Sequence, residues 1–184
     1  MDSRPEDCEA CPLENVAPDK TPASDPLEAA IAANQVGEMR LSAGANIVLE
    51  GASNPHLFVL VRGVGFRHKS LANGRRQILS YAFPGDLIGV QGVLLGTMQH
   101  SVDAISDVEL AVLERGCLAR LFEARPEAAY QIAWRGARDE CILDETLLAV
   151  GRRTAVESAA WLLVLLHQRA CVAGLAPKGR LAFP

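Results

Sequence analysis

The heptapeptide Phe83-Pro-Gly-Asp-Leu-Ile-Gly89 decides the fold of this 184-residue chain. Its Pro-Gly pair is a turn signal, and short β-branched segments lie on both sides of it. Further turn signals separate these segments, and Asn73-Gly74 predicts a hairpin between residues 64–70 and 75–81. The other segments predicted as strands are 46–49, 56–62, 101–105 and 108–113. Strands at this spacing predict an antiparallel roll or barrel.

The chain outside this region has a different pattern on each side. Residues 1–26 are acidic and rich in proline, which predicts an irregular lead-in, and residues 27–36 are predicted to form a short helix. After Cys117 the period becomes helical: Pro126 can open a long helix that Gly151 would end. The T-x-x-E spacing of Thr154-Ala-Val-Glu157 is a capping box at the head of an apolar segment that ends near residue 174.

Four motifs together resemble those of the Crp/Fnr family of bacterial regulators, over about residues 36–184. The heptapeptide 83–89 resembles the end of that family's sensor roll, where a Pro-Gly-Asp turn leads into a short helix beside the effector pocket. Residues 50–63 resemble its first long hairpin, 74–78 the next one, and 151–157 the joint before the DNA-binding domain. With its Cys-x-x-Cys-Pro near the N-terminus, the chain is most similar to FixK-like and Fnr-like members.

The resemblance implies an α+β fold: an antiparallel β-roll of the cyclic-nucleotide-binding type (a double-stranded jelly roll), a long dimerisation helix, and the first helix of a winged-helix domain. It divides the chain into a flexible acidic segment (1–26), the roll (27–118), the dimerisation helix (119–151) and the start of the winged-helix domain (152–184). In the family, the DNA-reading helix-turn-helix would follow Phe183-Pro184. We therefore expect an effector- or redox-responsive transcription regulator that binds promoter DNA in its full-length form, and no specific DNA binding by these residues alone.

The resemblance places the effector pocket at Gly89, Val90, Gln91, His100 and Ser101. A cyclic-nucleotide pocket of this fold needs an acid for the ribose hydroxyl and an arginine for the phosphate. Val90 stands where the acid belongs, and no Lys or Arg occurs between Arg76 and Arg115. The sequence thus argues against a cyclic nucleotide and leaves the effector unnamed. His100 could supply partial charge, although an ordinary polar loop residue is the simpler interpretation.

Five cysteines in a chain without a signal-peptide pattern are not expected to form structural disulfides. Cys8-x-x-Cys11 has the spacing of a metal chelate or a redox pair. Iron–sulfur members of the family use three N-terminal cysteines plus one from the roll, whereas the next cysteine here is Cys117. No cofactor is therefore firmly predicted, an iron–sulfur cluster is unsupported, and both a redox pair and an inert tail stay open. Cys141 and Cys171 are expected to be packing residues.

The long helix has an a/d seam that predicts a homodimer. The seam residues are Ala133, Gly136, Glu140, Leu143, Leu147 and Val150. A second apolar stripe consists of Tyr130, Trp134, Ala137, Cys141 and Leu148. We expect this stripe to face the chain's own roll while the seam meets the same helix of a second subunit. The reverse assignment stays open, with Glu140 then in solvent.

Composition excludes several other classes. The longest nearly apolar run, residues 159–166, is far shorter than the roughly 20 residues of a membrane span, so we expect a cytoplasmic protein with no membrane partner. The first 40 residues hold nine acids and three bases, the rest thirteen and fifteen, which is no nucleic-acid footprint. The histidines lack the spacing of a cupin, and no catalytic motif occurs, so no enzyme is predicted. The alternatives are a stand-alone ligand-binding module without DNA function and, third, a cupin-like metal enzyme.

Overall fold

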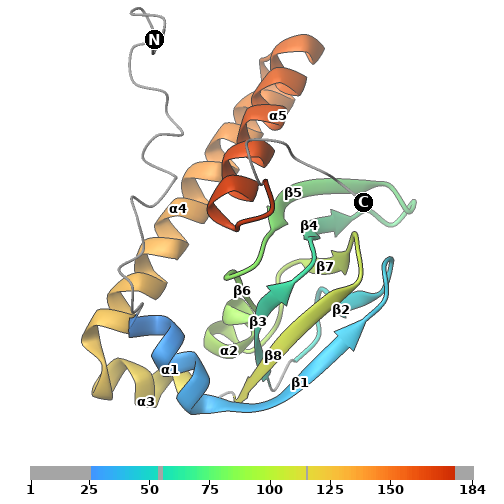
Figure 1. Cartoon of the computed structure of the whole chain (residues 1–184). Coiled ribbons are helices and arrows are strands. Elements are labelled where there is room, and N and C mark those ends of the chain that lie inside the picture. Colours follow the sequence, from blue (N-terminus) through green and yellow to red (C-terminus); the bar gives the residue numbers. More distant parts are fainter. Residues whose placement is uncertain (1–25, 54–55, 115, 177–184) are drawn as a thin grey trace, which may run out of the picture.

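The computed structural model describes residues 26–53, 56–114 and 116–176, which form a β-roll followed by helices (Figure 1). The strands are β1 (Gln35–Leu41), β2 (Asn46–Val48), β3 (His56–Arg62), β4 (Gly65–Ser70), β5 (Arg76–Ala82), β6 (Leu87–Ile88), β7 (Ser101–Ala104) and β8 (Val108–Glu114). The helices are α1 (Pro26–Asn34), α2 (Val90–Leu95), α3 (Cys117–Ala124), α4 (Pro126–Gly151) and α5 (Ala155–Val172).

The roll consists of two four-stranded sheets, with strand orders β1-β8-β3-β6 and β2-β7-β4-β5. Every strand pair is antiparallel, which confirms the predicted α+β fold with its antiparallel roll. Leu60, Val102 and Leu110 are fully buried in one core cluster of the roll. A second cluster joins β3 and β8 to α1, α3 and the start of α4, through residues such as Leu57 and Leu113. Strand β3 is buried along most of its length because it contributes to both clusters.

The hairpin predicted at Asn73-Gly74 joins β4 to β5, with Ser70 paired to Arg76. Gly74 has a φ of 81°, a left-handed conformation that glycine adopts without strain, and the Asn73 side chain accepts a hydrogen bond from the Arg75 N–H at 3.1 Å. The register of this strand pair shifts between Arg67 and His68. Such irregularities re-aim side chains, and Arg67 belongs to the site described below.

Helices α4 and α5 form a hairpin that extends beyond the roll, with α5 returning beside the upper half of α4 (Figure 1). The capping box is present as predicted, since the Thr154 hydroxyl accepts from the Glu157 N–H and the Glu157 carboxylate accepts from the Thr154 N–H. Ile142 and Leu165 pack between the two helices. The far end of α5 packs against the roll itself, through a cluster that includes Leu166, Ala170, Val64 and Phe83. Helix α5 therefore touches both the β-roll and the long helix.

One predicted helix boundary is wrong. The helix predicted over 27–36 ends at Asn34, because Gln35 and the residues after it pair with β8 instead. Pairing with a distant strand here overrides the local helical pattern. The long helix begins at Pro126 and ends at Gly151, as predicted, and Arg152 caps it.

The prediction that the second stripe of α4 faces the roll is also wrong. The buried residues of α4 are Ala128, Ile132, Arg138 and Ile142, whereas Tyr130, Ala137, Cys141 and Leu148 are exposed and Trp134 is half-buried. The apolar pattern missed this face because its buried set includes Arg138, whose charge is neutralised by ion pairs. Cys141 and Cys171 are likewise exposed rather than packed in a core.

Candidate functional site

The Pro-Gly-Asp turn delivers the chain to a cavity beneath α4. Gly85 has a φ of 91°, and the Asp86 carboxylate accepts a hydrogen bond from the Phe83 N–H at 2.9 Å, which closes the turn. Strand β6 then pairs with β3, and Gly89, with a φ of 104°, turns the chain into α2. The heptapeptide thus fixes where α2 begins.

The cavity has a volume of about 490 Å³, within the range of small-molecule sites. Of the residues predicted for an effector pocket, Gly89, Val90, Gln91 and His100 line it. Ser101 is not one of the lining residues, because it is buried and its hydroxyl accepts a hydrogen bond from the Glu50 N–H at 2.9 Å. The apolar part of the wall includes Leu79, Leu87, Ile88, Val90, Met98, Ile132 and Leu143.

The cavity also has charged walls that sequence reasoning missed. Arg67 and Lys69 from β4, and Arg135, Arg138, Asp139 and Glu140 from α4, line it. The expectation of a pocket without arginine considered only the stretch between Arg76 and Arg115. The fold brings cations from β4 and α4 instead. One available signal was the group of charged residues at 135 and 138–140, which interrupts the apolar pattern of the long helix.

Arg67 and Asp139 join the roll to α4 across this cavity. The Arg67 Nη1 lies 2.5 Å from the Asp139 Oδ2, and the Arg67 Nη2 donates to the Leu87 carbonyl at 3.3 Å. The side chains are 15% and 25% exposed, so this ion pair is largely shielded from water. Burial alone would raise the pKa of Asp139, but Arg67 and Arg138 lower it below its ordinary value.

The pair continues into a buried chain of alternating charges. The Arg138 Nη2 lies 2.9 Å from the Asp139 Oδ1 and 3.1 Å from the Asp86 Oδ1, and the Asp86 Oδ2 accepts a hydrogen bond from the Arg169 Nη2 on α5. Burial would raise the pKa of Asp86, but Arg169, Arg138 and Arg67 together lower it to about 2. The order Arg67, Asp139, Arg138, Asp86, Arg169 therefore runs from the cavity wall to α5. We call these five residues the ion chain.

His100 contributes no positive charge near neutral pH. Burial, followed by the positive charge of Arg67, lowers its pKa to about 4. The partial charge considered for it from the sequence is thus absent where it would be needed. Its neighbour in the wall, Gln91, has a buried Oε1 for which the described residues provide no hydrogen-bond partner.

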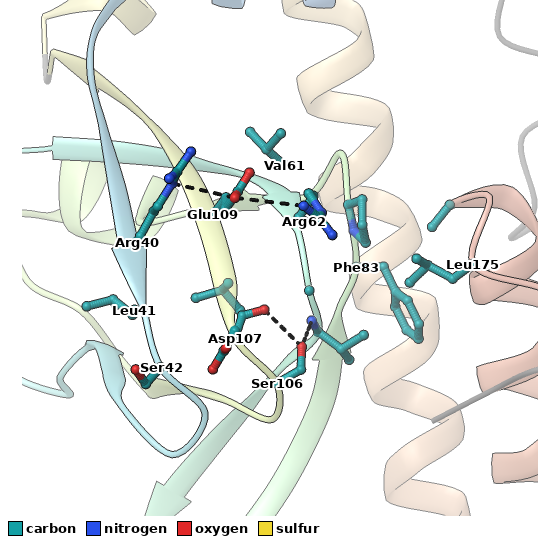
Figure 2. Close-up of a pocket in the computed structure, with 15 residues that line it drawn as sticks. Arg40, Leu41, Ser42, Val61, Arg62, Phe83, Ser106, Asp107, Glu109 and Leu175 are labelled. Atoms are coloured by element: carbon teal, nitrogen blue, oxygen red, sulfur yellow. Dashed lines mark hydrogen bonds and ion pairs between the residues drawn. The ribbon is translucent and has the colours of Figure 1, made fainter. Parts of the chain in front are cut away.

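A larger hollow of about 890 Å³ lies on another side of the roll, between its strands and the end of α5. Figure 2 shows Glu109 between Arg40 and Arg62, with Phe83 and Leu175 on the side of α5. The ion pairs of Glu109 with Arg40 and Arg62 span 3.5 and 3.9 Å. Both arginine side chains are more than 70% exposed, so the pairs contribute little to stability. None of the residues predicted for an effector pocket lines this hollow.

Within residues 26–53, 56–114 and 116–176, no group of three His, Cys, Asp or Glu side chains is placed to hold a metal ion. Cys8 and Cys11 lie outside these residues, so the structure says nothing of the predicted redox pair. In the same part of the chain, no helix has the length and apolar character to cross a membrane.

This chain is similar to known proteins in sequence and in fold. Residues 38–125 match the cyclic nucleotide-binding domain. A probable transcriptional activator of Rhizobium leguminosarum bv. viciae is 30% identical over 71% of this chain and 54% of its own length. The transcriptional activatory protein AadR of Rhodopseudomonas palustris is 32% identical over 59% of this chain and 44% of its own length. The chain thus spans about half the length of the curated relatives it matches.

Solved structures agree with these relatives. FixK2 from Bradyrhizobium japonicum superposes with a TM-score of 0.65 at 25% identity, over 72% of this chain and 66% of that one. The catabolite activator protein of Thermus thermophilus, 24% identical, shares the fold with a TM-score of 0.57, over 83% of this chain and 77% of that one. Residues 38–125 therefore form a cyclic nucleotide-binding domain, and the chain is a homologue of the regulators of the Crp/Fnr family.

Proposed function

We propose that this chain is the sensor and dimerisation portion of a DNA-binding transcription regulator of the Crp/Fnr type. The observation that carries the proposal is the ion chain, which links the wall of the cavity at Arg67 to Arg169 on α5. A ligand that changes the position of Arg67 or Asp139 would alter the ion pairs that hold α5 against the roll. This is the coupling that a sensor needs.

The regulator acts as a homodimer through α4. Leu143, Leu147 and Val150 of the predicted seam are 42%, 73% and 65% exposed in the protomer, which leaves their apolar surface available to a second copy. Gly136, Glu140 and Leu143 also line the cavity. The seam and the effector site therefore share residues, so that occupancy of the cavity and subunit contact influence one another.

The remaining assignments follow the resemblance. Residues 1–26 are the Cys-x-x-Cys segment, 27–118 the sensor roll, 119–151 the segment that contains the dimerisation helix α4, and 152–184 the start of the winged-helix domain. Promoter DNA is the partner of the full-length protein, which works in the cytoplasm and is not an enzyme. The effector is a small molecule held in the cavity or, alternatively, a redox signal received by Cys8 and Cys11. A stand-alone binding module is disfavoured because the curated relatives carry names of transcriptional activators or regulators.

Chromatin immunoprecipitation tests the transcriptional role in the cell that makes the protein. With a tag at the N-terminus, we expect discrete promoter segments to be enriched over an untagged strain, and their transcripts to change when the gene is deleted. Enrichment equal to that of the untagged strain would overturn the role in transcription and favour the stand-alone module.

A further inference from the structure

We propose that the cavity beneath α4 binds a small carboxylic acid with an apolar body, and that Arg67 is the anchor for its carboxylate. In the structure described here, the Asp139 carboxylate occupies that anchor as an internal substitute. The inference deepens the proposed function and rests on it in taking this cavity as the effector site.

The first observation is a charge imbalance. Three arginines of the ion chain, Arg67, Arg138 and Arg169, share only two carboxylates, those of Asp86 and Asp139. Four of these five side chains are at most 15% exposed, and Asp139 is 25% exposed. An unbalanced charge is costly where water is excluded. A ligand carboxylate would supply the third anion.

The second observation concerns the geometry of Arg67. Its Nη1 already lies 2.5 Å from the Asp139 carboxylate, and its Nη2 donates a hydrogen bond to the Leu87 carbonyl. The planar guanidinium matches a carboxylate in shape and charge, so a ligand carboxylate reproduces the contact that Asp139 makes. Asp139 keeps its second partner, Arg138, when it gives up the first. The exchange therefore leaves no carboxylate without a cation.

The third observation is the rest of the wall. Leu79, Val90, Met98 and Ile132 provide an apolar lining that suits a hydrocarbon or aromatic body. Gln91 also lines the cavity, and its buried Oε1 has no hydrogen-bond partner among the described residues. His100 is neutral near pH 7 and adds no charge to this wall.

Calorimetry on the full chain tests the anchor, with octanoate and benzoate as probes and their neutral amides as isosteres. We expect Asp139→Asn to bind each carboxylate at least about tenfold more tightly than wild type does, because the internal competitor is gone. The same variant should prefer each carboxylate to its amide by a similar factor. Arg67→Gln should bind acid and amide equally. Arg62→Gln, which removes an exposed arginine from the other hollow, should behave as wild type.

Equal binding of acid and amide by Asp139→Asn, or binding of neither at about 10 mM, would overturn the proposal. If Arg67→Gln does not fold, the Asp139→Asn measurement decides alone, because a merely structural ion pair would lower stability without raising carboxylate affinity. The two proposals fail separately. A carboxylate preference without promoter enrichment refutes only the transcriptional role, and promoter enrichment without that preference refutes only the carboxylate site.

Discussion

Asp86 and Arg169 lie 83 positions apart and form a buried ion pair that ties α5 to the turn in front of β6. Arg169 also stacks over Phe83, with its guanidinium carbon 5.4 Å from the ring centroid. Both contacts fall on the heptapeptide that decides the fold. The same short segment therefore forms a turn of the roll, leads into the wall of the cavity and binds α5.

Replacing Asp86 by Asn should destabilise the protein by about 3–5 kcal/mol, because Arg138 and Arg169 would lose the carboxylate they share in a buried place. Urea denaturation measures the change in the free energy of unfolding. Glu109→Gln is the matched control, since its partners Arg40 and Arg62 are exposed, and it should cost no more than about 0.5 kcal/mol. Equal losses for the two variants would contradict the central place of Asp86.

Replacing Arg169 by Gln should loosen α5 without unfolding the roll. Asp86 keeps Arg138 in this variant, whereas α5 loses its charged contact with the roll. Hydrogen exchange followed by mass spectrometry should show amides of residues 155–172 exchanging at least about tenfold faster, with β3 and β8 unchanged. Arg152→Gln, at an exposed position beyond α4, should leave both rates as in wild type. Uniform acceleration across roll and helix would argue against a local link.

Replacing Glu140 by Leu should tighten the dimer by about 1–3 kcal/mol. In a parallel two-fold pair the two Glu140 carboxylates would lie close together and repel each other. Sedimentation measures the dissociation constant. Glu127→Leu, on the same helix but outside the seam spacing, is the control. An unchanged dissociation constant for Glu140→Leu would reject the seam and favour the stripe that includes Ala137 and Cys141, which is also exposed.

Cyclic AMP should bind no more tightly than about 1 mM. Val90 lines the cavity where an acid for the ribose hydroxyl would be needed. Calorimetry on the purified chain checks this. A micromolar dissociation constant would show that the cavity supplies the missing anchors in another way.

His100 should make stability depend on pH between about 6.5 and about 4. Its pKa is lowered from 6.5 to about 4 in the folded protein, chiefly by burial, so the unfolded chain binds a proton in this range and the folded chain does not. The stability that neutral His100 contributes is therefore fully present above about pH 6.5 and decreases as the pH falls towards about 4. Denaturation at pH about 7 and about 5 should give a smaller difference for His100→Gln than for wild type. The same difference in both proteins would mean that His100 titrates normally.

The roll was predictable because its turns are local. Asn73-Gly74 and Pro84-Gly85 fix their turns with neighbouring residues, and the strands between them follow. The boundary between α1 and β1 was not predictable, because Gln35 becomes a strand residue only through pairing with β8.

The residues of the site were likewise predictable only where local sequence determines their position. The motif located Gly89, Val90, Gln91 and His100 at the cavity, since they lie close to it in sequence. Arg67 and Asp139 are 72 positions apart, and no local pattern announces that they meet. Burial of Arg138 depends on the same long-range contacts, which is why apolar periodicity assigned the wrong face of α4 to the roll.

The burial of Asp86 affects how the protein folds while it is being translated. The turn that buries this carboxylate is complete once β6 has left the ribosome, but its two cations, Arg138 and Arg169, are translated later. Until then a roll that closed would hold an anion without a partner, a state that favours the protonated acid or an open turn. Nascent roll should thus stay loosely folded until Arg138 on α4 emerges, so that the roll and the long helix over its cavity become native together.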